Sequence, residues 1–552
     1  MITALNTVDA GALPASPKGA LDHIVNAAPE RLHRVMPGTA LPLHSIAATR
    51  SLEHAAMAGL PPHTLMQRAG LSVARLALAV APHAHTIWVA CGPGNNGGDG
   101  LEAAMHLKRW GKQVVVTWLG TADTAPADAA KSYQRALDAG VQFADAPPAQ
   151  FELCIDALLG IGASSAARVP EGRMAQWIAA INSGMAPVLA VDVPTGLNAD
   201  TGHAGVLCVN AQFTLSLLTL KPGLFTGHGR DACGQVWLDD LNHADNLNAA
   251  DALHAPDAPI APIGLVAPTA PIAPVPGAGH DFATAWLSAA PASPPRAHAS
   301  HKGSYGDVAV IGGAPGMTGA ALLAASAALH SGVGRVFVAL LDGGAMAVDP
   351  QQPELMFRSW DALDFKALTV VCGCGGGDPV RHVLARVLSI AGSMVIDADA
   401  LNAIATDTQM ETLLRSRAAR QAHTVLTPHP LEAARLLGTT TALVQQDRLA
   451  AARQLGERFM CTVVLKGSGT VVAAPGQTLV INPTGNAALA TAGTGDVLAG
   501  MIGARLANAQ RNGRSAFQSA CDAVYLHGKA ADDWPAHRAL TAGALANRLA
   551  AR

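Results

Sequence analysis

Charged and aromatic residues are scarce in this sequence. Of the 552 residues, 14% are charged and 4% are aromatic, and the formal net charge at pH 7 is -3. Proteins that bind nucleic acid or anionic lipid through charge carry a strong positive field, which this balance does not supply. The sequence therefore predicts that neither nucleic acid nor a membrane surface is a partner.

A long uninterrupted hydrophobic run is also missing. The most hydrophobic stretch, 319–341, is interrupted by His330, by the turn-forming residues 331–334 and by Arg335. A membrane-spanning helix needs about 20 consecutive apolar residues, so none is predicted. The first thirty residues lack the basic start and apolar run of a secretory signal, and the expected location is cytoplasmic.

Cysteines at metal-binding spacing are absent as well. The eight cysteines are scattered, without paired C-x-x-C sets and without histidines at zinc spacing. We expect each to be a reduced, buried thiol. The closest pair, Cys372 and Cys374, flanks Gly373 in a glycine-rich turn, where a redox or metal role is the less favoured alternative.

The chain is long and has a proline-rich middle. Single hydrophobic cores stop growing near about 250 to 300 residues, so 552 residues predict two domains. Residues 255–277 are dense in proline, which neither continues a helix nor donates to a strand ladder. We therefore divide the chain into an N-terminal extension (1–40), a first domain (41–250), a linker (251–295) and a second domain (296–552).

On both sides of the linker, short runs rich in Val, Ile and Leu alternate with amphipathic helical segments. This alternation is typical of parallel sheets covered by helices on both faces, so an α/β fold is predicted. Ligands of such sheets bind beyond the carboxyl ends of the strands. The expected strands are 86–90, 113–118, 153–155, 188–191 and 213–217 in the first domain and 308–311, 335–339, 369–371, 394–396, 425–426 and 462–465 in the second.

A glycine-rich loop follows the first expected strand. Gly92, Gly94 and Gly97 formally match the G-x-G-x-x-G pattern of dinucleotide-binding loops, before a helix expected from about 101 to 110. The next strand ends without the acidic residue that would bind a ribose. An ordinary dehydrogenase is therefore disfavoured.

Polar side chains stand at three strand ends of the first domain. Asn95, Asn96 and Asp99 lie among the glycines, and Asp156 and Asp192 follow two later strands. A surface turn or a helix cap would explain each of them singly. Their convergence on one edge of the sheet favours a binding site with room for phosphate and ribose.

Five motifs of the first domain carry a family resemblance. They are Leu-Met-Gln-Arg-Ala-Gly (65–70), Gly-Asn-Asn-Gly-Gly-Asp-Gly (94–100), Asp-Ala-Leu-Leu-Gly-Ile-Gly (156–162), Val-Asp-Val-Pro-Thr-Gly (191–196) and Lys-Pro-Gly (221–223). Over about 45–245 the sequence resembles the NAD(P)H-hydrate epimerase family, which implies a Rossmann-like α/β/α domain.

The resemblance implies a substrate site and a potassium ion. Asp192 would move protons at the hydrated nicotinamide carbon C6, and Asn96, Asp156 and Thr195 would bind K⁺, which requires hard oxygen ligands. The implied substrate contacts are Asn95, Asn96, Gly97, Gly98, Asp99, Gly160, Ile161, Gly162, Ala163, Ser164, Ser165, Ala166 and Asp192.

The second domain has a candidate anion site near its end. Gly-Thr-Gly-Asp (493–496) precedes a helix with apolar residues at helical spacing. Backbone amides at such a helix start favour an anion, and Asp496 could act as a base beside it, although a simple capped helix start is the alternative. Lys466 to Thr470 follow a strand and suit nucleotide phosphates, yet they do not form a Walker loop, because the lysine precedes the glycines.

Further motifs give this domain its own resemblance. They are His-Lys-Gly-Ser-Tyr-Gly (301–306), Gly-Gly (312–313), Thr-Gly-Ala (318–320), Asp-Ala-Asp-Ala-Leu (397–401) and Leu-Thr-Pro-His-Pro-Leu-Glu (426–432). From about 296 to the end the sequence resembles the ADP- or ATP-dependent NAD(P)H-hydrate dehydratases, which have a ribokinase-like α/β/α fold. Bifunctional proteins join the two families in this order.

The second resemblance also implies residues and cofactors. Asp496 would be the catalytic base, Mg²⁺ would accompany ADP or ATP, and NADHX and NADPHX would be the substrates. The hydrate would meet Ala320, Gly375, Gly377, His429 and Asp496, whereas the nucleotide would meet Lys466, Gly467, Ser468, Gly469, Thr470 and Gly495. Because related dehydratases are often oligomeric, a homo-oligomer is expected.

Two other interpretations remain open at this stage. In the first, the second domain is a ribokinase-like vitamin-precursor kinase fused to a non-catalytic binding domain. It would share residues 493–496 but would not need 466–470 or 427–432 in these forms. In the second, the first domain is a non-catalytic scaffold, against which Asn96, Asp99, Asp156 and Asp192 argue.

Overall fold

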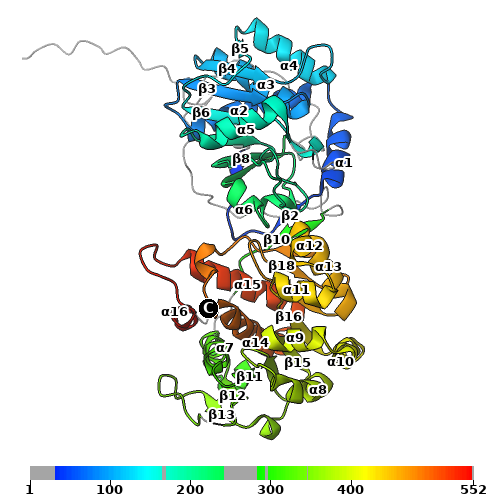
Figure 1. The fold of residues 1–552 in the computed structure, drawn as a ribbon, viewed down its shortest axis with the longest axis vertical. Helices are drawn as coiled ribbons and strands as arrows, with labels where there is room; N and C mark the ends of the chain where they lie inside the picture. The colour runs from blue at the N-terminus through cyan, green and yellow to red at the C-terminus, as the bar shows by residue number, and fades with distance from the viewer. Residues whose placement is uncertain (1–31, 164–169, 242–282, 293–295, 345, 550–552) are drawn as a thin grey trace, which may run out of the picture.

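Each half of the chain builds its own sheet, and Figure 1 shows the two halves one above the other. The computed structural model describes residues 32–163, 170–241, 283–292, 296–344 and 346–549. Among these residues the first sheet has eight strands and the second has eleven. Helices lie on both faces of each sheet, which confirms the predicted α/β fold class.

The first sheet is parallel except at one edge, where β1 pairs antiparallel with β9. All five strands predicted for this half are present. In spatial order the strands are β1 (His33–Arg34), β9 (Gln235–Asp239), β8 (Phe213–Leu217), β7 (Val188–Val191), β6 (Leu153–Ala157), β3 (Thr86–Cys91), β4 (Gln113–Trp118) and β5 (Gln142–Ala144).

The helices of the first half are α1 (Ile46–Met57), α2 (Thr64–Val80), α3 (Asn95–Arg109), α4 (Ala127–Asp138), α5 (Gly172–Ser183) and α6 (Gly229–Ala232). The prediction for α3 was wrong at its start, because the helix begins at Asn95 and not near residue 101. Its glycines allow close packing: a Cβ on Gly97 would lie 2.0 Å from the Gly92 carbonyl oxygen, and one on Gly100 would lie 2.5 Å from the Ala157 side chain. Small residues therefore bring the polar first turn of α3 onto the sheet.

The second sheet has a parallel centre and antiparallel additions. The pairs β17–β18 and β18–β19 are antiparallel, and so is the edge pair β10–β2. In spatial order the strands are β13 (Met356–Phe357), β12 (Arg335–Leu340), β11 (Asp307–Gly312), β14 (Thr369–Cys372), β15 (Ser393–Ile396), β16 (His423–Leu426), β17 (Thr462–Leu465), β18 (Val471–Ala473), β19 (Leu479–Ile481), β10 (Ala285–Leu287) and β2 (Leu41–Leu43). The six strands predicted for this half are among them.

The second sheet is also covered by helices on both faces. Helix α14 packs on β11, β14 and β15 and lies beside α7, α15 and α16. The helices are α7 (Thr318–His330), α8 (Val380–Ile390), α9 (Ala398–Ala405), α10 (Thr408–Ala419), α11 (Pro430–Leu437), α12 (Thr441–Gln446), α13 (Arg448–Phe459), α14 (Thr494–Asn512), α15 (Ala516–Asp532) and α16 (Ala542–Arg548).

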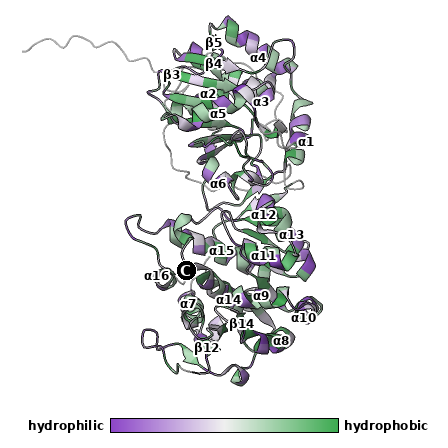
Figure 2. Cartoon of the chain, in the orientation of Figure 1, coloured by the Kyte–Doolittle hydropathy of each residue, from purple (hydrophilic) through white to green (hydrophobic). Residues whose placement is uncertain are grey.

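Alternate residues of the central strands serve different cores. In β11, Val308 and Val310 belong to one buried cluster, and Ala309 and Ile311 belong to another. Both faces are apolar because helices cover both, which explains why the strands read as continuous hydrophobic runs. Figure 2 shows hydrophobic residues along the strands and hydrophilic ones on outer helices such as α10.

One short strand of the predicted first domain joins the second sheet, and two others lie outside the predicted domains. Strand β2, at the start of the predicted first domain, pairs with β10, so it belongs to the second sheet. Strand β10 lies within the predicted linker, and β1 lies within the predicted N-terminal extension. Strands of two or three residues carry no readable periodicity, which is why sequence reasoning missed them.

No helix among the described residues is long and apolar enough to span a membrane. All eight cysteines are described and unbridged, as the sequence predicts.

Candidate active sites

A cavity of about 1200 Å³ lies beyond the carboxyl ends of the strands of the first sheet. Its floor consists of the residues that follow β3, β6, β7 and β8, and α1 and α2 supply further walls. Seven predicted site residues line it together: Asn95, Asn96, Asp99, Gly160, Ile161, Gly162 and Asp192. Gly97 and Gly98 lie behind them, buried in the first turns of α3. Ala163 closes the 3-10 turn Ile161–Ala163, and Ser164, Ser165 and Ala166 lie outside the described residues.

Asp192 forms an ion pair with Lys221 on the cavity floor. The Lys221 side chain is fully buried, and it also donates to the Leu217 carbonyl oxygen at 2.8 Å. Asp192 adopts a left-handed backbone with φ of 68°, a conformation that is costly for a non-glycine residue. The sequence motif contained Lys221, but sequence reasoning assigned it no role, because its partner is 29 residues away.

Asp99 faces the same cavity in a different electrostatic setting. Burial raises its pKa well above the usual value, and the carboxylates of Asp192, Glu53 and Glu102 raise the pKa further. Glu53 on α1 also has a raised pKa, because of its own burial and the charge of Asp192. The cavity therefore combines a carboxyl whose pKa is raised well above its usual value with an aspartate paired to a lysine.

Two of the predicted potassium ligands, Asp156 and Thr195, are bonded to each other, and the third, Asn96, lines the cavity. Asp156 is fully buried, and it accepts the Thr195 backbone N–H at 2.8 Å and the Thr195 hydroxyl at 2.7 Å. Burial raises the Asp156 pKa to about 6. The side-chain amide nitrogen of Asn96 is buried without a hydrogen-bond partner among the described residues. Gly160 packs on that amide, since a Cβ there would lie 2.8 Å from Asn96 Oδ1.

A monovalent cation fits this set of oxygens. An amide can turn to present its oxygen, and the carboxylate and hydroxyl supply the other two hard ligands. A bound cation would also offset the burial of the Asp156 carboxylate.

In the second half, Asp496 stands in the first turn of α14. Gly493 has φ of 89° and begins the helix, so the N–H groups of the first turn point outward without intrahelical partners. One oxygen of Asp496, one of Asp397 and the Cys374 sulfur lie within 4.8 Å of one another. Burial and the charge of Asp397 raise the pKa of Asp496 to about 7. Such a carboxyl can gain or lose a proton near neutral pH.

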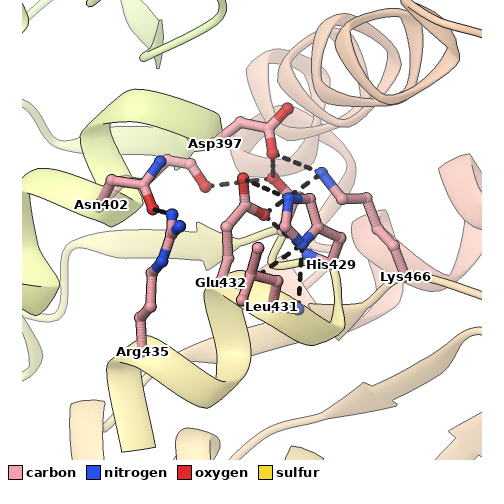
Figure 3. A network of polar contacts seen from close by, with 9 residues as sticks. Asp397, Asn402, His429, Leu431, Glu432, Arg435 and Lys466 are labelled. Atoms are coloured by element: carbon pink, nitrogen blue, oxygen red, sulfur yellow. Dashed lines mark hydrogen bonds and ion pairs between the residues drawn. The ribbon is translucent and has the colours of Figure 1, made fainter. Parts of the chain in front are cut away.

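Lys466 belongs to a polar network beside Asp496, shown in Figure 3. Its ammonium group donates to Asp397 Oδ1 at 2.7 Å and lies 4.0 Å from Glu432 Oε2. The Thr427 hydroxyl donates to the same Asp397 oxygen at 2.8 Å. A Cβ on Gly495 would lie 3.5 Å from the lysine nitrogen, so α14 starts next to this cation.

His429 caps α11 in the same network (Figure 3). Its Nδ1 accepts the backbone N–H groups of Leu431 and Glu432 at 3.1 and 3.2 Å, and its Nε2 lies 3.2 Å from Glu432 Oε1. Burial and the charge of Lys466 lower its pKa. The imidazole therefore has a clear structural role, and the predicted substrate contact would have to involve its half-exposed edge.

The predicted hydrate contacts Ala320, Gly375 and Gly377 gather at one place. A Cβ on Gly375, whose φ is 57°, would lie 2.9 Å from the Ala320 side chain. Gly377, with φ of 51°, donates its N–H to Asp399 at 2.8 Å and lines an open hollow of about 470 Å³. These left-handed glycines bring the turn after β14 close to the start of α7.

The predicted nucleotide loop, Lys466–Thr470, lies where the two halves meet. The Gly227 N–H donates to the Ser468 carbonyl oxygen at 3.1 Å, and the Thr226 hydroxyl donates to that of Gly469 at 3.0 Å. The Arg448 guanidinium donates to the carbonyl oxygens of Leu465 and Lys466. Sequence reasoning missed Thr226 and Arg448, since neither belongs to a motif.

Each half of the chain thus has a site with an aspartate beside a strand-end or helix-start turn and a lysine nearby, as expected of an α/β enzyme with two sites. Comparison with known proteins identifies both. The family described as YjeF-related protein N-terminus matches residues 62–223, and the family described as NAD(P)H-hydrate dehydratase matches residues 308–551.

Curated relatives cover both halves together. The bifunctional NAD(P)H-hydrate repair enzyme Nnr of Escherichia coli is 34% identical over 87% of this chain and 87% of its own length. The enzyme of the same name from Coxiella burnetii is 35% identical over 88% of this chain and 93% of its own length. The ADP-dependent (S)-NAD(P)H-hydrate dehydratase of Neisseria meningitidis is 46% identical over 46% of this chain and 86% of its own length.

This chain therefore belongs to the bifunctional NAD(P)H-hydrate repair enzymes. It is an epimerase and a nucleotide-dependent dehydratase that returns hydrated NAD(P)H to NAD(P)H, with an adenine nucleotide as co-substrate. The resemblance drawn from the sequence motifs is confirmed, and the kinase interpretation is not favoured.

Proposed function

We propose that Asp99 and Asp192 exchange protons with the hydrate in the first cavity. The observation that carries this proposal is the contrast between them: Asp99 has a raised pKa, and Asp192 is paired with the buried Lys221. A protonated carboxyl can donate to a leaving hydroxyl, and an ionised one can accept a proton.

The proposed epimerisation breaks and remakes the C6–oxygen bond of the hydrate. Asp99 gives its proton to the C6 hydroxyl, which leaves as water while the ring nitrogen supplies electrons to C6. Water then adds to the opposite face of the planar carbon, and Asp192 takes the surplus proton. Proton transfer from Asp192 to Asp99 through solvent restores the site.

The other residues predicted for the first site would contact the substrate or the potassium ion. The backbone and side chains of Asn95 to Asp99 and of Gly160 to Ala166 would hold the dinucleotide, supported by the part of this set that lines the cavity. Asn96, Asp156 and Thr195 would hold K⁺, supported by the buried Asp156 carboxylate and the Thr195 hydroxyl bonded to it. The ion would neutralise Asp156 and stiffen the turn after β6.

In the second site we propose that Asp496 takes the proton of the hydrate hydroxyl. The oxygen attacks the terminal phosphoryl group of ADP, and AMP leaves with the electron pair of the broken bond. Phosphate is a better leaving group than hydroxide, so loss of phosphate from C6 and of a proton from C5 restores the dihydronicotinamide. The N–H groups at the start of α14, with Gly495, would stabilise the charge on the transferred group.

Lys466 to Thr470 would hold the nucleotide phosphates, and Ala320, Gly375, Gly377 and His429 would face the hydrate. Mg²⁺ would arrive with the nucleotide and neutralise phosphate charge. A Mg²⁺ site made only of protein ligands, without the nucleotide, is less well supported. The described three-ligand cluster includes the Cys374 thiol, and its Asp397 carboxylate is already bonded to Lys466.

Three points stay predictions: the domain limits 41–250 and 296–552, a cytoplasmic location and a homo-oligomer. Sedimentation of the purified chain tests the last of these.

Absorbance at 340 nm tests the proposed chemistry. Purified chain is mixed with both NADHX epimers, Mg²⁺, K⁺ and either ADP or ATP. We expect recovery of essentially all NADH with a nucleotide present, and slower use of the R epimer when tetramethylammonium replaces K⁺. Recovery of only the S share in the presence of K⁺ would argue against the first-site proposal, and unchanged rates without K⁺ would argue against the ion.

A further inference from the structure

The proposed nucleotide loop is held on one side by the first half of the chain. The Gly227 N–H donates to Ser468 O at 3.1 Å, and the Ser468 hydroxyl donates to Gly227 O at 3.0 Å. The buried Thr226 hydroxyl donates to Gly469 O at 3.0 Å. A Cβ on Gly469 would lie 2.0 Å from the Phe225 carbonyl oxygen, so the two backbones are in direct contact.

Arg448 ties the same threonine to the base of the loop. Its Nε donates to Thr226 Oγ1 at 3.2 Å, and its Nη2 donates at 3.2 Å to the carbonyl oxygens of Leu465 and Lys466. Burial lowers the Arg448 pKa to about 10, so the group stays charged at neutral pH. Thr226 thus links a buried cation to the far end of the loop.

These contacts determine where the loop amides point. In a trans peptide, a carbonyl and the N–H of the next residue point in opposite directions. The carbonyls of residues 466, 468 and 469 are bonded toward Arg448 and the first half. The N–H groups of Gly467, Gly469 and Thr470 are therefore directed away from that interface, as an anion-binding loop requires.

The supporting segment is itself tightly packed. A Cβ on Gly202 would lie 2.1 Å from Thr226 O, and one on Gly223 would lie 2.2 Å from Asn198 O. Phe225 belongs to a buried cluster that also contains residues of the second sheet, such as Leu465. The segment can therefore act as a rigid support.

We propose that residues Phe225–Gly227 of the epimerase half are positioning residues for the nucleotide loop of the dehydratase half, with Thr226 as the key contact. The affinity of the dehydratase for ADP then depends on a part of the chain that lies outside the dehydratase family match. This inference rests on the proposed role of Lys466–Thr470 in binding the nucleotide.

Thr226→Val in the full chain tests the proposal, because valine keeps the shape and removes the hydroxyl. Loss of the bond to Gly469 and of the acceptor for Arg448 should raise KM for ADP on the order of tenfold. The dehydratase kcat at saturating ADP should stay within about twofold, because Asp496 is not touched. Thr226→Ser keeps the hydroxyl and should restore KM for ADP. A general effect of Thr226→Val on folding would instead lower both the dehydratase kcat and the epimerase rate.

Arg230→Gln is the matched control. Arg230 also crosses between the halves, but it donates to the carbonyl oxygens of Thr484 and Gly485 and not to the loop. KM for ADP should not change in this variant. Equal increases in KM for Thr226→Val and Arg230→Gln would overturn the proposal, since loosening of the whole interface would explain both.

Thr470→Val separates this inference from the function on which it rests. Thr470 bonds within the loop, to Gly467 O at 3.1 Å. A raised KM for ADP in Thr470→Val with an unchanged KM in Thr226→Val would refute the positioning role alone. Unchanged values in both variants would refute the nucleotide role of the loop and the inference together.

Discussion

Asp192 and Asp496 are the proposed catalytic carboxylates of the two halves, yet they have different partners. Asp192 follows a strand end and pairs directly with Lys221, whose side chain is fully buried. Asp496 lies at a helix start, and its neighbour Lys466 pairs instead with Asp397. A lysine thus pairs with the proposed catalytic carboxylate in the first site, and with a carboxylate beside the proposed catalytic one in the second.

This difference indicates that the charged neighbour of a carboxylate, and not its residue type, determines its proposed role in the reaction. Asp192 pairs directly with a lysine, whereas burial and the carboxylates of Asp192, Glu53 and Glu102 raise the pKa of Asp99. In the second site Lys466 pairs with Asp397, and burial together with the charge of Asp397 raises the pKa of Asp496 to about 7. In the proposed chemistry, the first site divides acid and base between two residues, and the second uses one carboxyl whose pKa is about 7.

The largest expected effect is that of Asp496→Asn. Removing a general base should lower the dehydratase kcat on the order of 10³- to 10⁴-fold, while epimerisation continues. NADH recovery from S-NADHX with ADP measures the first rate. Asp364→Asn, an exposed carboxylate of the same half, should leave both rates unchanged, and residual dehydratase activity above about a tenth would remove Asp496 from the base role.

Asp192→Asn should lower the epimerase rate by about 10²-fold, because Asp99 can still assist departure of the hydroxyl. Consumption of purified R-NADHX, coupled to the intact dehydratase half, measures it against the spontaneous rate. Asp128→Asn, another carboxylate on the cavity wall, is the control. Equal losses in the two variants would point to a general electrostatic effect.

Replacing each lysine by methionine compares how much the two ion pairs contribute to stability. Lys221→Met leaves a buried carboxylate without its partner and should lower the free energy of unfolding by about 3–5 kcal/mol. Lys466→Met should cost a similar amount, because the Asp397 carboxylate that it leaves behind is only 2% exposed. Urea unfolding followed by tryptophan fluorescence measures both, and a cost below about 1 kcal/mol for either variant would show that its carboxylate does not need the lysine.

The smallest effects concern pH. Because the Asp496 pKa is about 7, the dehydratase kcat/KM should fall tenfold per pH unit below that value and level off above it. Folding stability should change with pH in the opposite direction to activity. Because the pKa of Asp496 is raised in the folded chain, the group stabilises the fold while it is protonated, and this stabilisation is lost as pH rises from about 4 through about 7. Asp496→Asn should remove this loss.

Cys374 offers a finer adjustment of the same profile. Its hydrogen bond lowers the pKa of Asp496, so Cys374→Ala should move the bend in kcat/KM to higher pH. A downward shift would mean that the thiol destabilises the carboxylate. The epimerase rate, measured on the same samples, reports whether the chain remains folded.

Local signals in the sequence determined the fold class, the eleven predicted strands and the candidate loops. Runs of apolar residues specify strands buried on both faces, and the motifs place polar residues at strand ends such as Asp192 and at the start of α14. The start of α3 was misjudged, since its first turn is rich in glycine, which favours loops in isolation, and the short strands β1, β2 and β10 were missed.

Tertiary structure alone decided which of these residues work together. It paired Asp192 with Lys221, gave Lys466 to Asp397, joined Arg448 to Thr226 across 222 positions and placed β2 in the second sheet. None of these partners is readable from spacing, because long-range contacts depend on how the sheets and helices stack and not on local periodicity. The pKa values of Asp99 and Asp496 follow from the same stacking, since burial and neighbouring charge exist only in the folded chain.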